Sequence, residues 1–141
     1  MATTLFEEIL GQLAPALDLP NLHPDTHNAT RILWKKSVSI QLQFDQKDRF
    51  FLMVASLGAL PPDRFREDFF KAALAYNARY SLRYPLFTFA YSTKAQVLTL
   101  SASFERETLK PEQLPSTFLL LADTAYAWKE ALHKGIISPE L

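Results

Sequence analysis

The sequence predicts an α+β fold with a twisted antiparallel sheet packed by helices, in the order α-β-β-β-α-β-β-α. Three segments carry apolar residues at helical spacing, whereas five segments alternate apolar and polar residues with the period of a strand. Short polar connections join the strands within each group, and these favour antiparallel neighbours because parallel strands need long crossovers. We expect residues 1–141 to form one domain.

Each predicted helix has a start or stop signal. The first begins near Thr4, whose spacing to Glu7 is that of a capping box. The second follows Asp63, whose side chain suits the N-cap position. The third begins within 111–116, where proline is tolerated in the first turn, and ends near Gly135, a residue suited to the C-terminal cap.

The five predicted strands fall into a group of three and a group of two. The first group covers residues 30–35, 37–44 and 50–60, and the second covers residues 86–91 and 96–104. The helix that follows residue 63 separates the two groups. This arrangement predicts a three-strand meander followed by a hairpin.

The strand predicted at 50–60 is apolar on both faces. One face carries Phe50, Leu52 and Val54, and the other carries Phe51, Met53, Ala55 and Leu57. A strand in a small antiparallel sheet normally buries one face and exposes the other to water. The second face is therefore covered either by another layer of the same chain or by a partner, and both readings are open.

Composition excludes several classes of function. Fifteen Lys and Arg residues balance fifteen Asp and Glu residues, so no net field attracts nucleic acid or an anionic membrane. The chain has no cysteine, which excludes disulfides, thiol nucleophiles and cysteine-ligated metals and is compatible with a reducing cytosol. Glu7 and Glu8 argue against a secretory signal, and no apolar run is long enough to span a bilayer.

No constellation of residues predicts catalysis, a cofactor or a metal ion. His23 and His27 have the four-residue spacing of a helical zinc pair, but Pro24 opposes a helix there and no third ligand is apparent. Basic and aromatic residues mix around Arg79 and Arg83, but the balanced charge favours helix packing over nucleic-acid binding. We expect no catalytic, cofactor-binding or metal-binding residues.

The whole-chain pattern resembles the class I type III secretion chaperones, the effector chaperones of the Tir-chaperone type. The resemblance covers nearly the whole chain and lies in its size, its element order and three segments: FFKAALAYNARY, PLFTFAYSTKAQVLTLSASFERETLKPEQL and TFLLLADTAYAWKEAL. It implies a non-enzymatic homodimer of the bacterial cytoplasm that keeps a secreted effector stable and secretion-competent. The implied partners are the unfolded chaperone-binding segment of the effector, bound in extended form, a second copy of the chain, and the secretion ATPase.

Two interaction surfaces are predicted on this basis. An unfolded segment could pair with an edge strand and place its side chains on an apolar patch; the cargo-binding residues that we expect are Leu33, Phe51 and Met53. The dimer interface would combine the second helix with the aromatic hairpin, because small alanines allow close approach; the residues that we expect in it are Phe69, Ala72, Ala73, Tyr76, Phe87 and Phe89.

Two other classes of function stay open. The chain could be an adaptor module that binds a folded partner, and the state of the captured partner would separate this reading from a chaperone. It could also be a small enzyme with an apolar cone-shaped pocket. Such an enzyme needs an acid, base or histidine at an inward strand position, and the strands offer none apart from the terminal Glu105.

Overall fold

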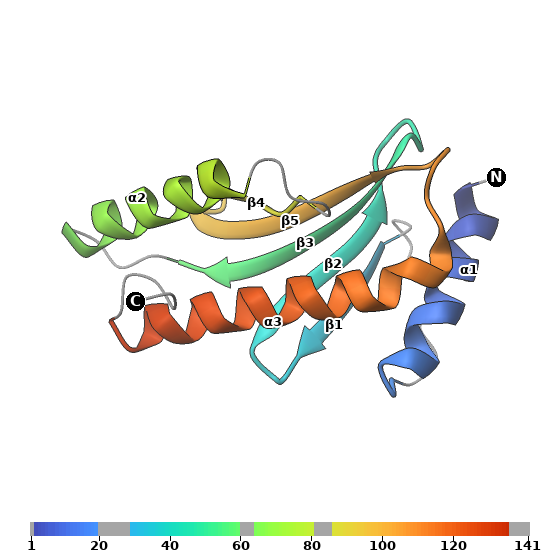
Figure 1. Cartoon of the computed structure of the whole chain (residues 1–141), viewed down its shortest axis with the longest axis horizontal. Helices are drawn as coiled ribbons and strands as arrows, with labels where there is room; N and C mark the ends of the chain where they lie inside the picture. Colours follow the sequence, from blue (N-terminus) through green and yellow to red (C-terminus); the bar gives the residue numbers. More distant parts are fainter. Residues whose placement is uncertain (1, 20–28, 60–63, 81–85, 136–141) are drawn as a thin grey trace.

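The computed structural model describes residues 2–19, 29–59, 64–80 and 86–135, and these residues form five strands and three α-helices in the predicted order (Figure 1). All strands belong to one antiparallel sheet with the order β1-β2-β3-β5-β4. The bounds are β1 (Ala29–Trp34), β2 (Val38–Phe44), β3 (Phe50–Gly58), β4 (Thr88–Ser92) and β5 (Val97–Glu105). The predicted α+β class is confirmed.

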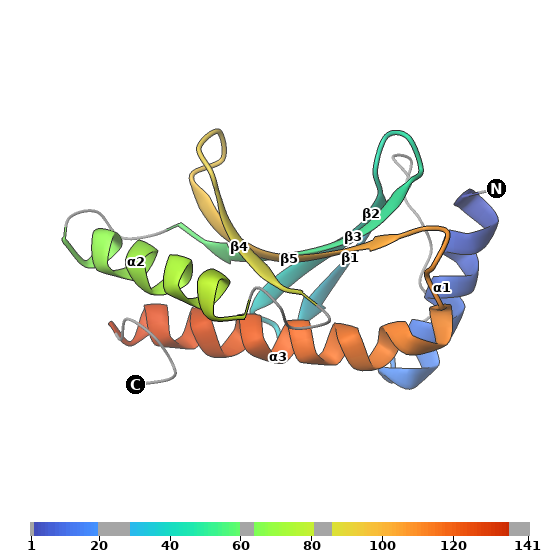
Figure 2. The ribbon, with the colours of Figure 1, turned by 45° about the horizontal axis from the view of Figure 1, so that its top comes forward.

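The helices are α1 (Ala2–Ala16), α2 (Arg64–Arg79) and α3 (Leu114–His133), and a short 3₁₀ turn, Pro111–Gln113, precedes α3. All three lie on one side of the sheet, and α3 runs along the sheet from α1 toward α2 (Figures 1 and 2). The tips of the β2–β3 and β4–β5 hairpins rise on the opposite side (Figure 2). The protein therefore has one sheet face under helices and one open face.

Most predicted boundaries lie within one or two residues of those observed, and two of the differences have a structural meaning. The first helix begins at Ala2, so Thr4 lies inside its first turn and the predicted capping box is wrong. The strand predicted to reach residue 60 ends at Gly58, where the pairing with β5 shifts register and the backbone φ angle is +85°. Glycine adopts this left-handed conformation without steric cost, and the chain can leave the sheet there. Asp63 lies outside the described residues.

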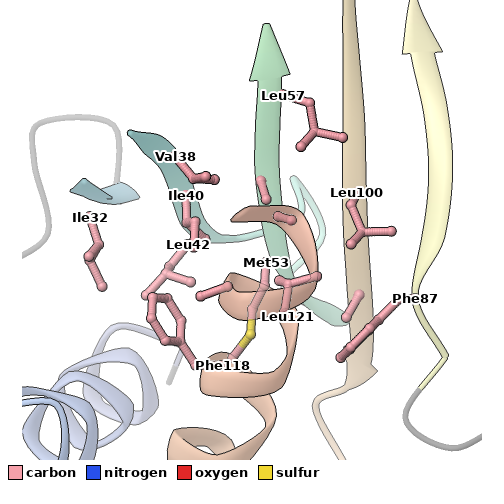
Figure 3. Close-up of a cluster of buried hydrophobic side chains, with 14 of the residues drawn as sticks. Ile32, Val38, Ile40, Leu42, Met53, Leu57, Phe87, Leu100, Phe118 and Leu121 are labelled. Atoms are coloured by element: carbon pink, nitrogen blue, oxygen red, sulfur yellow. The ribbon is translucent and has the colours of Figure 1, made fainter. Parts of the chain in front are cut away.

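The core lies between α3 and the centre of the sheet. Phe118 and Leu121 of α3 lie beside Met53 of β3 (Figure 3), and none of the three side chains has exposed area. Other buried residues along the sheet extend this layer; those labelled in Figure 3 are Ile32, Val38, Ile40, Leu42, Leu57, Phe87 and Leu100. The period of two along each strand thus places one set of apolar side chains under the helices.

The two faces of β3 have different surroundings. Phe51, Met53, Ala55 and Leu57 point toward the helices and are buried. Leu52 and Val54 lie on the open face and are half-buried, and Phe50 is 37% exposed. Within the described residues the second apolar face is therefore only partly covered by the chain itself.

Removing the Phe118 ring should destabilise the protein strongly. We expect Phe118→Ala to lower the free energy of unfolding by about 3–5 kcal/mol, because the ring is fully buried and its loss leaves a cavity. Urea unfolding followed by circular dichroism would measure the change. The exposed neighbour Leu119 is a matched control, and Leu119→Ala should cost less than about 1 kcal/mol. Equal losses in the two variants would contradict the assigned core.

Candidate functional site

Most residues predicted for the dimer interface lie in the core of the protomer. The Trp128 indole of α3 lies 4.5 Å from the Phe89 ring and 5.6 Å from the Phe69 ring, measured between ring centroids. The five residues in question, Phe69, Ala73, Tyr76, Phe87 and Phe89, are all buried. Their apolar surface attaches α2 and β4 to α3, and this burial argues against the predicted interface role.

The outward face of α2 carries other apolar residues. Leu74 is 67% exposed, and Ala75 and Ala78 are exposed beside it. Ala72, the sixth residue predicted for the interface, is half-buried. We call the exposed residues Leu74, Ala75 and Ala78, together with Ala72, the α2 surface. The α2 surface thus presents one large apolar side chain beside three small ones.

The three residues predicted to bind cargo lie in two different environments. Phe51 and Met53 have no exposed area and face the helices, so they are core residues of this protomer and have no surface for a partner to contact. Leu33 is 62% exposed and lies on β1, which is an edge strand of the sheet. The alternation along β3 was read correctly, but the face assigned to cargo is the one that the helices cover.

The open face beside β1 is mostly polar. Arg31 pairs in register with Gln41, and its Nη2 donates a hydrogen bond to Gln41 Oε1 at 3.1 Å. Leu33 pairs with Ser39, and the next residue in line on β3 is Ser56. Leu33 is therefore a large apolar side chain beside small polar ones, at an edge of the sheet.

The end of β1 is attached to α3 by a polar and aromatic cluster. The Trp34 Nε1 donates a hydrogen bond to Asp123 Oδ1 at 3.2 Å, and the Trp34 ring packs edge-on against Phe118 with centroids 5.8 Å apart. Lys35 Nζ lies 3.6 Å from the same Asp123 oxygen and 4.7 Å from the centroid of the Tyr126 ring. One carboxylate thus holds two consecutive residues of the hairpin against the helix.

The turn between β1 and β2 needs such support. Lys35 and Lys36 have φ angles of 49° and 57°, a left-handed conformation that lysine adopts rarely. The Ser37 N–H donates a hydrogen bond to the Trp34 carbonyl at 2.9 Å, and Lys129 Nζ donates to the Ser37 carbonyl. Contacts from α3 therefore offset the strain of the turn and fix the position of the β1 edge.

Asp45 closes the β2–β3 hairpin. Its Oδ1 accepts hydrogen bonds from the N–H groups of Arg49 and Phe50, at 2.8 and 3.3 Å. Desolvation raises the pKa of Asp45, but these hydrogen bonds and the Arg49 charge outweigh it, so the pKa lies below the ordinary value. The carboxylate fixes the start of β3.

A groove of ≈ 570 Å³ opens beside Phe50, and its lining residues are Leu5, Lys47, Asp48, Arg49, Phe50, Glu105, Arg106 and Glu107. Glu105, which was considered as an enzyme residue, is an exposed member of this lining. In the described parts of the chain, no three His, Cys, Asp or Glu side chains gather as a metal site. His23, His27 and Arg83 lie outside these parts.

Comparison with known proteins decides the family. The sequence profile of the Tir chaperone protein (CesT) family matches residues 8–129. The chain belongs to this family. Membership confirms the resemblance to type III secretion chaperones and the prediction of an effector-binding chaperone. No described helix could cross a membrane, by length and apolar content. No curated protein matches the sequence.

Solved structures with the same fold include chaperone–effector complexes. The ExsC–ExsE complex matches with 20% identity and a TM-score of 0.73, covering 92% of this chain and 95% of that one. The HopA1–SchA chaperone–effector complex matches with 18% identity and a TM-score of 0.74, covering 93% and 98%. The ExoU–SpcU complex of Pseudomonas aeruginosa matches with 17% identity and a TM-score of 0.63, covering 88% and 97%. At these identities the likeness shows a shared fold.

Loss of the Asp123 carboxylate should loosen the β1–β2 hairpin without unfolding the protein. We expect Asp123→Ala to lower the free energy of unfolding by less than about 1 kcal/mol, because Asp123 and Lys35 are both half exposed. Hydrogen exchange of the Ser37 amide should become faster by on the order of fivefold. Asp123→Asn keeps an acceptor for Trp34 and should have a smaller effect. Unchanged exchange in both variants would contradict the anchoring role.

Proposed function

We propose that this chaperone binds an extended segment of a secreted effector along the edge of β1, in the bacterial cytoplasm. The observation that carries the proposal is the position of Leu33, an exposed apolar side chain on an edge strand that α3 holds in place. Edge strands present unpaired N–H and C=O groups that a second extended chain can bond. Family membership supports effector binding, and the geometry supports this edge.

Strand addition at β1 would give the effector two kinds of contact. Side chains on one face of the added strand would lie next to Ile32 and Trp34, on the helical side of the sheet. Side chains on the other face would lie next to Arg31 and Leu33, on the open side. Backbone hydrogen bonds would supply affinity for any extended segment, and these alternating positions would supply preference among sequences.

Burial of apolar surface would supply part of the binding free energy. Each Å² of apolar area removed from water contributes roughly 25 cal/mol, from which the cost of ordering the effector segment is subtracted. No bond is made or broken in this mechanism, so the proposed function is non-enzymatic. The mostly polar face beside β1 and the surface charges around the Phe50 groove support this reading, because neither offers a buried acid or base.

Replacing Leu33 by a charge should abolish effector binding while leaving the fold intact. The tagged chain is purified from its native cell, the co-purified protein is identified by mass, and the same pull-down is repeated with Leu33→Asp. We expect at least about a tenfold loss of the partner, because the substitution replaces the apolar side chain that the added strand would contact with a hydrated charge. Leu120→Asp, at an exposed leucine of α3, is the matched control and should retain binding.

Hydrogen exchange would distinguish an extended segment from a folded partner. Amides of β1 should become protected when the effector segment binds. Limited proteolysis of the complex should leave only a short effector segment, and this segment should have no structure of its own when it is free. Protection confined to another surface, or capture of an intact folded domain, would contradict strand addition and favour an adaptor.

We further propose that the chain is a homodimer joined through the α2 surface. Leu74 would be buried between the two copies, and Ala75 and Ala78 would allow two symmetry-related helices to approach closely. Ala72 lies at the margin of this surface, and it is the one residue of the interface predicted from sequence that is half-buried rather than buried. The buried residues beneath it would act indirectly, by holding α2 in place.

A charge at Leu74 should separate the two copies. Light scattering of the wild-type protein at micromolar concentration should give a mass near twice the 16.1 kDa of one chain. Leu74→Arg should give the mass of one chain with an unchanged circular dichroism spectrum, because the side chain is 67% exposed in the protomer. Leu119→Arg is the control at a different exposed leucine and should remain dimeric. A wild-type mass of 16.1 kDa at all concentrations would overturn the dimer.

A further inference from the structure

The sheet has two edges, and they differ. β1 forms one edge and β4 forms the other. A bare edge strand accepts an extended chain through its backbone, whatever the sequence of that strand. Some feature of the protein must therefore decide which of the two edge strands can pair with an extended chain.

The side chain of Asn77 on α2 bonds the backbone of β4 at Phe89. Asn77 Nδ2 donates a hydrogen bond to the Phe89 carbonyl at 2.9 Å, and the Phe89 N–H donates to Asn77 Oδ1 at 2.7 Å. Both backbone groups of Phe89 point to α2, so they face away from β5, the strand with which β4 pairs. A primary amide thus presents to β4 the same donor and acceptor that the peptide group of a neighbouring strand would present.

The contacts around Asn77 keep it in this position. The Phe89 ring packs against Tyr76 with centroids 5.1 Å apart, on the same helix as Asn77. One step along the same edge, the ring of Tyr91 packs against Phe70 with centroids 5.0 Å apart, and Arg66 donates a hydrogen bond to the Tyr91 hydroxyl. The helix therefore bonds the backbone of β4 at Phe89 and packs against the side chains of Phe89 and Tyr91.

Between Arg31 and Trp34, the edge of β1 has no such cover among the described elements. Its backbone neighbour is β2, and its contacts with α3 come from the side chains of Trp34 and Lys35 at the hairpin end. No described side chain bonds the backbone of residues 31–34 as Asn77 bonds that of Phe89. β4 is therefore covered at Phe89, whereas this part of β1 is open.

We propose that Asn77 closes the β4 edge to strand addition and thereby directs extended segments to β1. Covering an edge in this way prevents pairing between copies of a protein. The proposal that extended segments are directed to β1 rests on the function proposed above. The proposal that β4 is closed rests on the Asn77 contacts alone. Loss of the amide leaves two backbone groups that a strand from a second copy can bond.

The test is self-association of Asn77→Leu, a substitution of similar shape that removes both hydrogen bonds. We expect sedimentation velocity to show species larger than the wild-type assembly, in amounts that rise with concentration. The Phe89 amide should exchange at least about tenfold faster than in the wild type. Wild-type sedimentation together with wild-type exchange would overturn the proposal.

Two further variants separate edge protection from simple destabilisation. Adding Thr88→Lys to Asn77→Leu places a charge on the exposed edge strand, which should restore the wild-type mass without restoring Phe89 protection. Phe69→Leu weakens the packing of α2 on Trp128 but keeps the Asn77 amide, and it should not self-associate. Self-association of Phe69→Leu equal to that of Asn77→Leu, or no rescue by Thr88→Lys, would overturn the proposal.

Effector binding is measured separately on the same proteins. Asn77→Leu should still bind the effector segment at β1, and Leu33→Asp should not. If the wild-type chain binds no effector at β1, the proposed function fails while the result on self-association still decides the role of Asn77.

Discussion

The packing of Phe118 and Leu121 against Met53 places α3 over the centre of the sheet, and the other surfaces depend on this contact. A five-strand sheet has two faces, and α3 with the other helices covers one of them (Figure 2). The apolar residues of β3 that face α3 become core, whereas Leu52 and Val54 on the other side remain half-buried. The open face and the free edge follow from this one-sided cover.

The same helix also fixes both edges of the sheet, by different chemistry. Near one edge, Asp123 and Lys129 hold the β1–β2 hairpin through polar contacts that water can reach. Near the other, Trp128 holds α2 and β4 through a buried aromatic cluster. Buried aromatic packing contributes more stability than exposed polar contacts do. The β4 side is therefore the firmer one, and residues 31–34 of β1 keep a backbone that is positioned but uncovered.

The element order and the fold class were predictable because alternation and helical spacing survive in every segment. The choice of buried face was not predictable, because β3 is apolar on both sides and periodicity alone does not say which side meets a helix. This ambiguity assigned Phe51 and Met53 to the cargo. Phe69 of α2 and Phe89 of β4 were assigned to the dimer because an apolar stripe does not say whether it meets another part of the chain or a second copy. A signal existed in Trp128: a large apolar side chain in the last helix needs partners, and the aromatic residues of α2 and β4 provide them.

The roles of Asn77 and Asp123 could not be read from the sequence. Each is a polar residue on an amphipathic helix, where a solvent-facing position is the ordinary expectation. Asn77 contacts Phe89, which is 12 positions away in the sequence, and Asp123 contacts Trp34, which is 89 positions away. Such contacts depend on the register of the finished sheet, which local pattern does not specify.

The placement of the two tryptophans has a practical consequence. Trp128 is 2% exposed at the centre of the aromatic cluster, whereas Trp34 is half-buried at the β1 edge. The chain has no other tryptophan, so its tryptophan emission has only these two sources. The Trp128 indole responds to loss of the core, and the Trp34 indole responds to what covers the edge. Intrinsic fluorescence with one indole replaced by phenylalanine at a time can thus follow folding and occupancy as separate signals, without an added label.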